Sequence, residues 1–156
     1  MFQKKIILLL LLLLSSCGYE TISSKKNSID YSFSVSELSF VGDRTINLKI
    51  KEKLNNYIQS KKNKNFILRI SSTSEKIILA KNNAGDAKSF KNTISINVEV
   101  LMNNKFKSNL GIIESFNYNN ISNKFDLKNY EDEIKNNLAE TATEKIIFKL
   151  SNIQWY

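Results

Sequence analysis

The segment that decides the fold of this 156-residue chain is Ile94-Ser95-Ile96-Asn97-Val98-Glu99-Val100. Apolar and polar side chains alternate through it without interruption, and Met102 extends the apolar set. A period of two places all the apolar side chains on one face of a β-strand, so the segment predicts a strand with one buried face. That face must be covered by another layer of secondary structure.

The residues that follow predict a hairpin. Asn103-Asn104 can supply its turn, because Asn tolerates positive φ better than most residues. Apolar residues then interleave with polar ones over residues 112–118, so we expect a strand that returns antiparallel to the first. Phe116 and Tyr118, in this returning strand, are interpreted as core residues.

Another strand is expected upstream, where Phe66, Leu68 and Ile70 alternate with Ile67, Arg69 and Ser71. The apolar content on both sides of this alternation predicts that the strand is covered on much of both faces. We expect it to continue, after a break, through residues 77–79. Residues 81–88 are polar and contain a glycine, which predicts a loop that connects this strand to the strand at residue 94.

The first strand and the first helix are predicted near the start of the domain. Residues 31–35 alternate aromatic or aliphatic side chains with serine, and Leu38 and Phe40 follow in the opposite phase, so we expect a bulge near Glu37. Asp43 is placed to cap a helix. Its apolar face follows from the spacing of Ile46, Ile50, Leu54, Tyr57 and Ile58.

The last long element is a helix that we expect to run from about Leu127 or Tyr130 to Leu150. Asn129 is its candidate N-cap, and residues 131–133 place negative charge in its first turn, where the helix dipole favours it. Its apolar stripe recurs every four residues: Ile134, Leu138, Ala142, Ile146 and Leu150. Trp155 and Tyr156 close the chain and are expected to pack on the domain.

These elements give the order β-α-β-β-β-α and an α+β fold in which two helices pack on a four-stranded mixed sheet. The first two strands are joined through a helix, which permits a parallel pair in an otherwise antiparallel sheet. Residues 30–156 are enough for one domain with a core and too few to suggest two.

The segment before the domain is typical of an export signal. Residues 1–16 combine Lys4 and Lys5 with an apolar run from Ile6 to Leu14, which is shorter than the roughly 20 residues of a membrane-spanning helix.

Leu14-Ser15-Ser16-Cys17 resembles a lipobox. This resemblance implies cleavage before Cys17 and acylation of that residue, which would hold the chain on a membrane. The alternative is a plain secreted protein with one buried cysteine. Gly18, where inner-membrane lipoproteins often carry Asp, favours the outer membrane, and residues 17–29 read as a flexible tether.

The composition of the chain favours some classes of partner and argues against catalysis. Loss of Lys4 and Lys5 leaves 21 basic against 15 acidic residues, a side-chain charge of +6 that favours anionic partners. Export argues against nucleic acid as a partner. The chain has no histidine, which excludes His-based triads and His metal sites. No Gly-x-Ser-x-Gly turn and no metal-ligand cluster occurs in the sequence, so we expect no catalytic residues, no metal and no cofactor.

Three segments resemble the LPS-assembly lipoprotein (LptE) family. They are Cys17-Gly18-Tyr19 after the lipobox, the loop at residues 82–88 leading into residues 94–101, and the ending at residues 138–150, with its Leu-Ala pair, small residues and closing Leu. The resemblance, which also rests on the element order, implies an outer-membrane lipoprotein without covalent chemistry. Members of the family sit inside the LptD β-barrel, help that barrel to fold, and bind lipopolysaccharide.

The resemblance also implies where lipopolysaccharide would bind. Two positions that are basic in the family align with Asn83 and Asn136, which are neutral here. Nearby lysines could supply the charge, because Lys pairs with phosphate groups. The candidate lipopolysaccharide-binding residues are Lys81, Lys88, Lys91 and Lys135. The alternative function is that of another outer-membrane lipoprotein, which serves as a subunit or an envelope-polymer-binding module of a different assembly machine.

Overall fold

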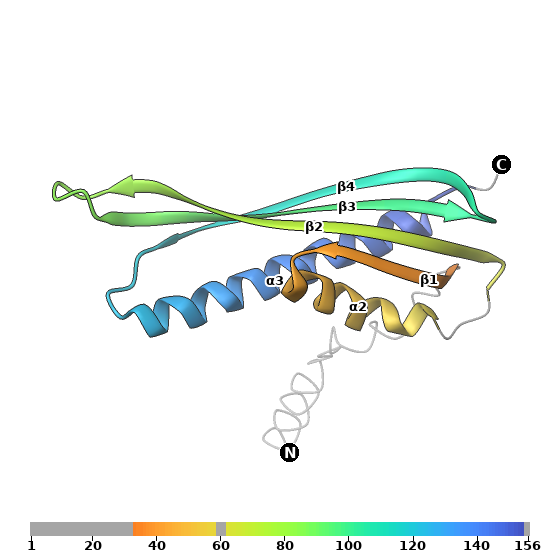
Figure 1. Ribbon diagram of the computed structural model, residues 1–156, viewed down its shortest axis with the longest axis horizontal. Coiled ribbons are helices and arrows are strands. Elements are labelled where there is room, and N and C mark those ends of the chain that lie inside the picture. The colour runs from red at the N-terminus through yellow and green to blue at the C-terminus, as the bar shows by residue number, and fades with distance from the viewer. Residues whose placement is uncertain (1–32, 59–61, 155–156) are drawn as a thin grey trace, which may run out of the picture. The chain divides into compact units, whose positions relative to one another are not determined.

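The computed structural model describes residues 33–58 and 62–154, which belong to one compact unit, residues 31–156. The predicted signal peptide, Cys17, the predicted tether and the Trp155-Tyr156 pair lie outside the described residues. Figure 1 shows the elements in chain order. They are β1 (Phe33–Gly42), α2 (Arg44–Ile58), β2 (Lys64–Lys81), β3 (Ala87–Met102), β4 (Lys105–Asn119) and α3 (Lys124–Ser151).

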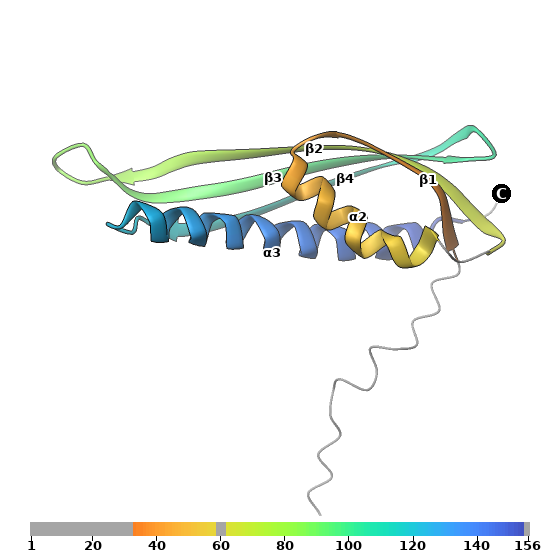
Figure 2. The same ribbon diagram turned by 60° about the horizontal axis from the view of Figure 1, so that its bottom comes forward.

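The four strands form one sheet in the order β1-β2-β3-β4. β1 pairs parallel with β2, and the other two pairs are antiparallel. Both helices lie on the same face of this sheet, with α3 extending along most of its length (Figures 1 and 2). The predicted α+β fold, with two helices on a four-stranded mixed sheet, is therefore confirmed.

The alternation in β3 works as predicted. Its even-numbered residues from Phe90 to Val100 are buried beneath the helices, and Ile94, Val98 and Val100 have no exposed area. The turn that follows is also confirmed, since Asn103 and Asn104 adopt φ angles of 52° and 59°. β4 returns from this turn and buries Leu110, Ile112 and Tyr118.

The bulge predicted near Glu37 is present. The register of β1 against β2 shifts between Val35 and Glu37. Before the shift Phe33 and Val35 are buried, and after it the partly buried Leu38 and Phe40 pack against the same core. The extra residue thus restores the apolar side chains to the helix-facing side when their phase changes.

A close backbone approach joins β1 to α2. Gly42 has a φ of 101°, and a Cβ atom there would lie 1.9 Å from the backbone oxygen of Ser72, so only glycine fits. Asp43 then caps α2 as predicted, because its Oδ1 accepts hydrogen bonds from the backbone N–H groups of Thr45 and Ile46. The buried face of the helix consists of Ile46, Ile50 and Leu54.

Two predictions for β2 are wrong. The strand is continuous from Lys64 to Lys81, without the expected break, because β3 pairs with it along this length; the ladder irregularities come only between Ile78 and Lys81. Only one face is well covered, since Arg69 and Ser71 are exposed and Ile67 is half-buried. Both helices lie on the opposite face and leave this one open.

The predicted start of α3 is also wrong. The helix begins at Lys124, and Asn123, not Asn129, is its N-cap: the Asn123 side chain accepts hydrogen bonds from the N–H groups of Phe125 (2.9 Å) and Asp126 (3.4 Å). Phe125 is exposed and Leu127 only half-buried, so the first turns carry no buried stripe that periodicity could detect. Of the predicted stripe, Leu138 is half-buried and the other four residues are buried.

Candidate functional site

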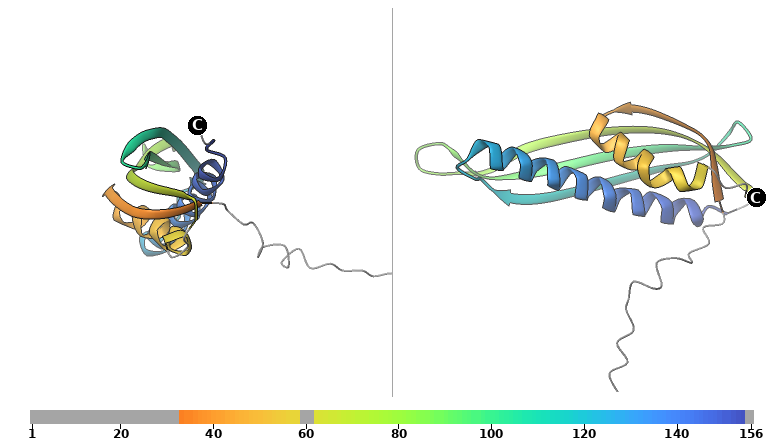
Figure 3. Two further views of the ribbon diagram at one scale, coloured as in Figure 1. Left: turned by 90° about the vertical axis from the view of Figure 1, so that its right-hand side faces the viewer. Right: turned by 90° about the horizontal axis from the view of Figure 1, so that it is seen from below.

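The predicted lysines at the end of the β2–β3 hairpin meet in one place. Lys81 and Lys88 line a shallow, open hollow together with Asn82, Asn83 and Ala84. The hairpin end projects beyond the body of the sheet (Figure 3). The structure therefore brings together two of the four candidate lysines and one of the two positions that are basic in the resembled family.

Asn82 holds this loop in shape. Its Oδ1 accepts hydrogen bonds from the N–H groups of Ala84 (3.0 Å) and Asp86 (2.8 Å), while its own N–H donates to the Asp86 carbonyl. Gly85 supplies the left-handed conformation that the loop requires, with a φ of 90°. The loop thus presents its lysines from an ordered backbone.

The two lysines of the hollow form no ion pair with the described carboxylates. Among residues 33–58 and 62–154, no carboxylate forms an ion pair with Lys81 or Lys88. The one nearby carboxylate of the loop, Asp86, instead accepts a hydrogen bond from the Asn82 amide at 3.1 Å. Both ammonium groups can therefore bind an anion without first breaking an internal contact.

Lys91 lies outside the hollow. It lies in β3, where it is opposite Ile77 of β2 and Asn117 of β4. Its neighbours Phe90 and Asn92 are buried beneath α3, which places the half-buried Lys91 on the open face of the sheet. It could extend a cationic surface along that face, and it has no ion-pair partner among the described residues.

Lys135 is placed differently from the other three. Its Nζ lies 3.0 Å from Asp43 Oδ2, and both side chains are largely buried. Burial of the Asp43 carboxyl acts to raise its pKa, but the hydrogen bond and charge of Lys135, with the N–H groups of Ile46 and Thr45, hold this pKa below its ordinary value. Lys135 thus joins α3 to the start of α2, while the neighbouring Asn136 is exposed.

Sequence reasoning missed a cluster beneath the first half of α3. Glu131, interpreted as a first-turn carboxylate, instead forms an ion pair with Lys76 of β2 and accepts a hydrogen bond of 2.9 Å from the Tyr118 hydroxyl. The Lys76 ammonium also lies 4.1 Å from the ring centre of Phe90. Burial raises the pKa of the Tyr118 phenol well above its usual range, and Glu131 acts in the same direction. No local spacing in the sequence connects these four residues.

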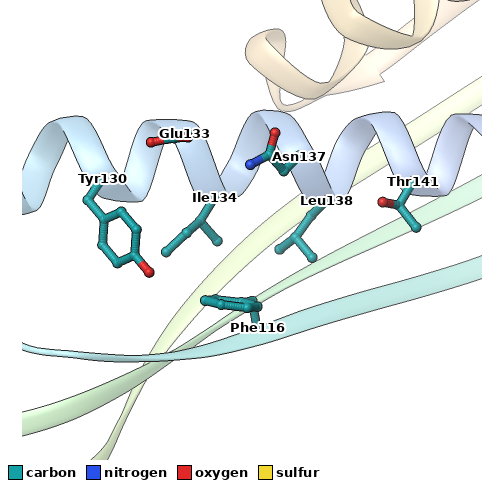
Figure 4. Close-up of a pocket in the computed structure, with 7 residues that line it drawn as sticks. All are labelled: Phe116, Tyr130, Glu133, Ile134, Asn137, Leu138 and Thr141. Atoms are coloured by element: carbon teal, nitrogen blue, oxygen red, sulfur yellow. The ribbon is translucent and has the colours of Figure 1, made fainter.

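A groove of about 240 Å³ lies between β4 and α3, next to this cluster. Figure 4 shows Phe116 of β4 directed towards Ile134 and Leu138 of α3, with Tyr130 beside them. Phe116 and Tyr130 are 46% and 36% exposed, so of the two β4 aromatic residues interpreted as core, Tyr118 is buried, at 5%, and Phe116 is not. The lining is completed by Glu133, Asn137 and Thr141.

The described part of the chain contains neither a membrane-spanning helix nor a group of side chains suited to a metal ion. Neither α2 nor α3 is long and apolar enough to cross a bilayer. No group of three or more His, Cys, Asp or Glu side chains in residues 33–58 and 62–154 is arranged to hold a metal ion.

The fold is similar to those of solved lipoprotein structures. The rare lipoprotein B from Shewanella oneidensis aligns with a TM-score of 0.57 at 16% identity, over 74% of this chain and 93% of that one. The minor lipoprotein from Acinetobacter baumannii gives 0.56 at 14%, over 76% and 92%. The uncharacterized lipoprotein B from Nitrosomonas europaea gives 0.58 at 17%, over 76% and 83%. No protein-family model matches the sequence, and neither does any curated protein.

Proposed function

We propose that the chain is an outer-membrane lipoprotein of the LptE type, which partners an LptD-type β-barrel in the assembly and insertion of lipopolysaccharide. The observation that carries this proposal is the fold shared with rare lipoprotein B, which is another name for LptE. The lipobox at Leu14–Cys17 supports the same conclusion from an independent part of the sequence. The role would be one of binding and scaffolding, with no covalent step.

The hairpin end fits the lipopolysaccharide part of this role. Phosphate groups on a lipid are anionic, and Lys81 and Lys88 present from an ordered loop two ammonium groups that have no ion pair with the described carboxylates. Charge-assisted hydrogen bonds to phosphate are among the stronger polar contacts. Lys91 would add charge on the open face of the sheet, whereas Lys135 would act indirectly, by holding α3 against α2.

The partnership is tested by purifying the tagged, full-length protein from outer membranes. A large β-barrel should be recovered with it in a constant ratio. Recovery of the lipoprotein without any barrel would overturn the proposed partnership. Recovery with a different envelope machine would favour the alternative role as a subunit of that machine.

Lipopolysaccharide binding is tested by changing Lys81, Lys88 and Lys91 together to Glu. We expect binding of purified lipopolysaccharide to weaken by at least about tenfold, since attraction to phosphate becomes repulsion. The matched control changes Lys51, Lys105 and Lys124 to Glu, because these three lysines are exposed and, like the tested ones, have no ion pair among the described residues. Equal losses in the two variants would show a non-specific charge effect, and unchanged binding in the first would place the site elsewhere.

The anchor is tested separately by Cys17→Ala. Without the thiol no lipid can be attached, so we expect an uncleaved or soluble protein in the periplasm. Membrane fractionation provides the measurement. Normal retention in the outer membrane would exclude lipidation of Cys17 as the main tether.

A further inference from the structure

The two edges of the sheet differ in how well they are protected. β1, at one edge, is bulged near Glu37, and a bulge discourages the addition of another strand. β4, at the other edge, pairs with β3 without a register shift from Ser108 to Asn119. A regular edge of this length is a template for strand pairing unless something covers it.

Two hydrogen bonds establish which backbone groups of β4 point outward. The N–H of Asn120 donates to the Lys88 carbonyl, on the β3 side. The carbonyl of Gly111 instead accepts a hydrogen bond from the side chain of Lys149, at 3.3 Å. Residues of an antiparallel strand alternate between the two sides. The N–H and C=O groups of Ile113, Ser115 and Asn117 therefore point away from β3.

Side chains of α3 protect only part of this edge. Lys149 donates a hydrogen bond to the Gly111 carbonyl, and Lys145 forms an ion pair with Glu114 at 2.5 Å. Within the described residues, no side chain forms a hydrogen bond to the outward backbone groups of Ser115 or Asn117, and both residues are exposed. Residues 115–119 thus form an open section of the edge.

The groove described above continues this open section. Phe116 belongs to both, and its ring faces the apolar side chains of Ile134 and Leu138 on α3 (Figure 4). Glu133, which also lines the groove, is exposed and has no ion pair among the described residues. A strand added here would turn alternate side chains towards the groove, and a cation on it could meet Glu133.

We propose that the β4 edge at residues 115–119 and the adjoining groove accept an extended segment of a partner protein, which adds a fifth strand to the sheet. The segment carries alternating aliphatic side chains, which enter the groove against Phe116 and Leu138, and a Lys or Arg opposite Glu133. Main-chain bonds to Ser115 and Asn117 supply affinity, and the groove supplies specificity. The inference rests on the proposed partnership with a barrel only for the source of the segment.

The probe is a short synthetic peptide that alternates Val with Thr and contains one Lys, added to the full domain. Binding is followed by amide NMR shifts and hydrogen exchange. We expect slower exchange at Ser115 and Asn117, because their N–H groups gain acceptors. Asn117→Pro should weaken binding about tenfold, since it removes an outward donor but no bond to β3. Asn109→Pro is the matched control, because it removes an outward N–H beyond the proposed site, and it should leave binding unchanged.

Glu133→Lys keeps the test decisive if a proline variant fails to fold. It should weaken binding of the Lys peptide and strengthen binding of a matched Glu peptide. Equal binding to Asn117→Pro and the unaltered protein, or no binding of either peptide, would overturn the proposal. So would protein-concentration-dependent protection of the same amides without peptide, which would identify a second copy of the chain as the occupant. None of these outcomes affects the co-purification test of the barrel partnership.

Discussion

The half of the sheet beneath α2 and the end of α3 packs differently from the half beneath the beginning of α3. The first region, here called the proximal core, is one apolar cluster of 19 buried residues that draws on all four strands and both helices. The second, the distal cluster, contains three buried residues, Phe90, Tyr118 and Ile134. Helix α3 and strands β2, β3 and β4 thus run from the densely packed proximal core to the sparsely packed distal cluster.

Polar side chains mark the boundary between the two regions. On the helix-facing side of the sheet, Ser74 and Ile94 lie opposite each other in neighbouring strands, as do Lys76 and Asn92. Buried Asn92 accepts a hydrogen bond from Ser74, and Lys76 reaches Glu131 on α3. The first half of α3 is therefore held largely by hydrogen bonds and ion pairs, not by apolar burial.

The comparison connects stability to the proposed function. Regions with few buried apolar contacts open locally at lower free energy than the core. The cationic loop and the open β4 edge both belong to the sparsely packed half, where a partner could be accommodated by small adjustments. The proximal core would keep the domain folded while this happens.

The largest effect is expected from Leu68→Ala in the proximal core. Leu68 has no exposed area, so truncation leaves a cavity and should cost about 2–5 kcal/mol of unfolding free energy. Leu48→Ala is the matched control, because Leu48 is 55% exposed and should cost less than about 1 kcal/mol. Urea unfolding measures both. Similar losses in the two variants would mean that the proximal core does not dominate stability.

A smaller and more local effect is expected from Ile134→Ala in the distal cluster. The side chain is buried, but few apolar neighbours surround it, so the cost should fall near 2 kcal/mol, at the low end for such truncations. Hydrogen exchange should accelerate in residues 124–137 of α3 and remain nearly unchanged in residues 142–150. Uniform acceleration along the whole helix would show that the two regions open together.

The sequence predicted the proximal core far better than the distal cluster, and the reason is physical. Periodicity reports which side chains face an apolar layer, and Ile94–Val100, Ile46–Leu54 and the stripe of α3 all face one. The bulge near Glu37 was visible for the same reason, since it changed the phase of that pattern. Asp43 and the Asn103-Asn104 turn were predictable from local backbone chemistry.

The distal half lacked such signals. The first turns of α3 carry few buried side chains, so the helix start was misplaced, and exposed Ile77 resembled core in the sequence. Glu131 pairs with Lys76, which is 55 positions away in the sequence, and Lys135 pairs with Asp43, which is 92 positions away. Residue spacing does not predict contacts over such separations. The loop at residues 81–88 was predictable from its polar, glycine-containing sequence, and a hairpin loop brings residues close in sequence, such as Lys81 and Lys88, together in space.

Tyr118→Phe tests how much the polar contacts contribute to the distal cluster. The change keeps the ring on Phe90 but removes the hydroxyl that donates to Glu131 at 2.9 Å. Since Glu131 retains Lys76, the expected cost is about 1 kcal/mol. Thermal unfolding together with exchange of the α3 amides would measure it. An unchanged midpoint would show that the hydrogen bond of the Tyr118 hydroxyl does not contribute to the stability of this half.

The smallest effect is expected from Asp43→Asn, which tests the ion pair that joins the first half of α3 to the proximal region. Asn also caps helices well, so the change removes the charge opposite Lys135 while keeping the cap. Because the pKa of Asp43 is lower in the folded protein than in the unfolded chain, the pair stabilises fully above about pH 4 and progressively less as pH falls below that value. The variant should therefore lose less than about 1 kcal/mol at pH 7 and converge with the unaltered protein in the acid range in which the Asp43 carboxyl of the folded protein becomes protonated. Urea unfolding across this range measures the difference, and a gap that stayed constant with pH would mean that the loss reflects the cap and not the charge.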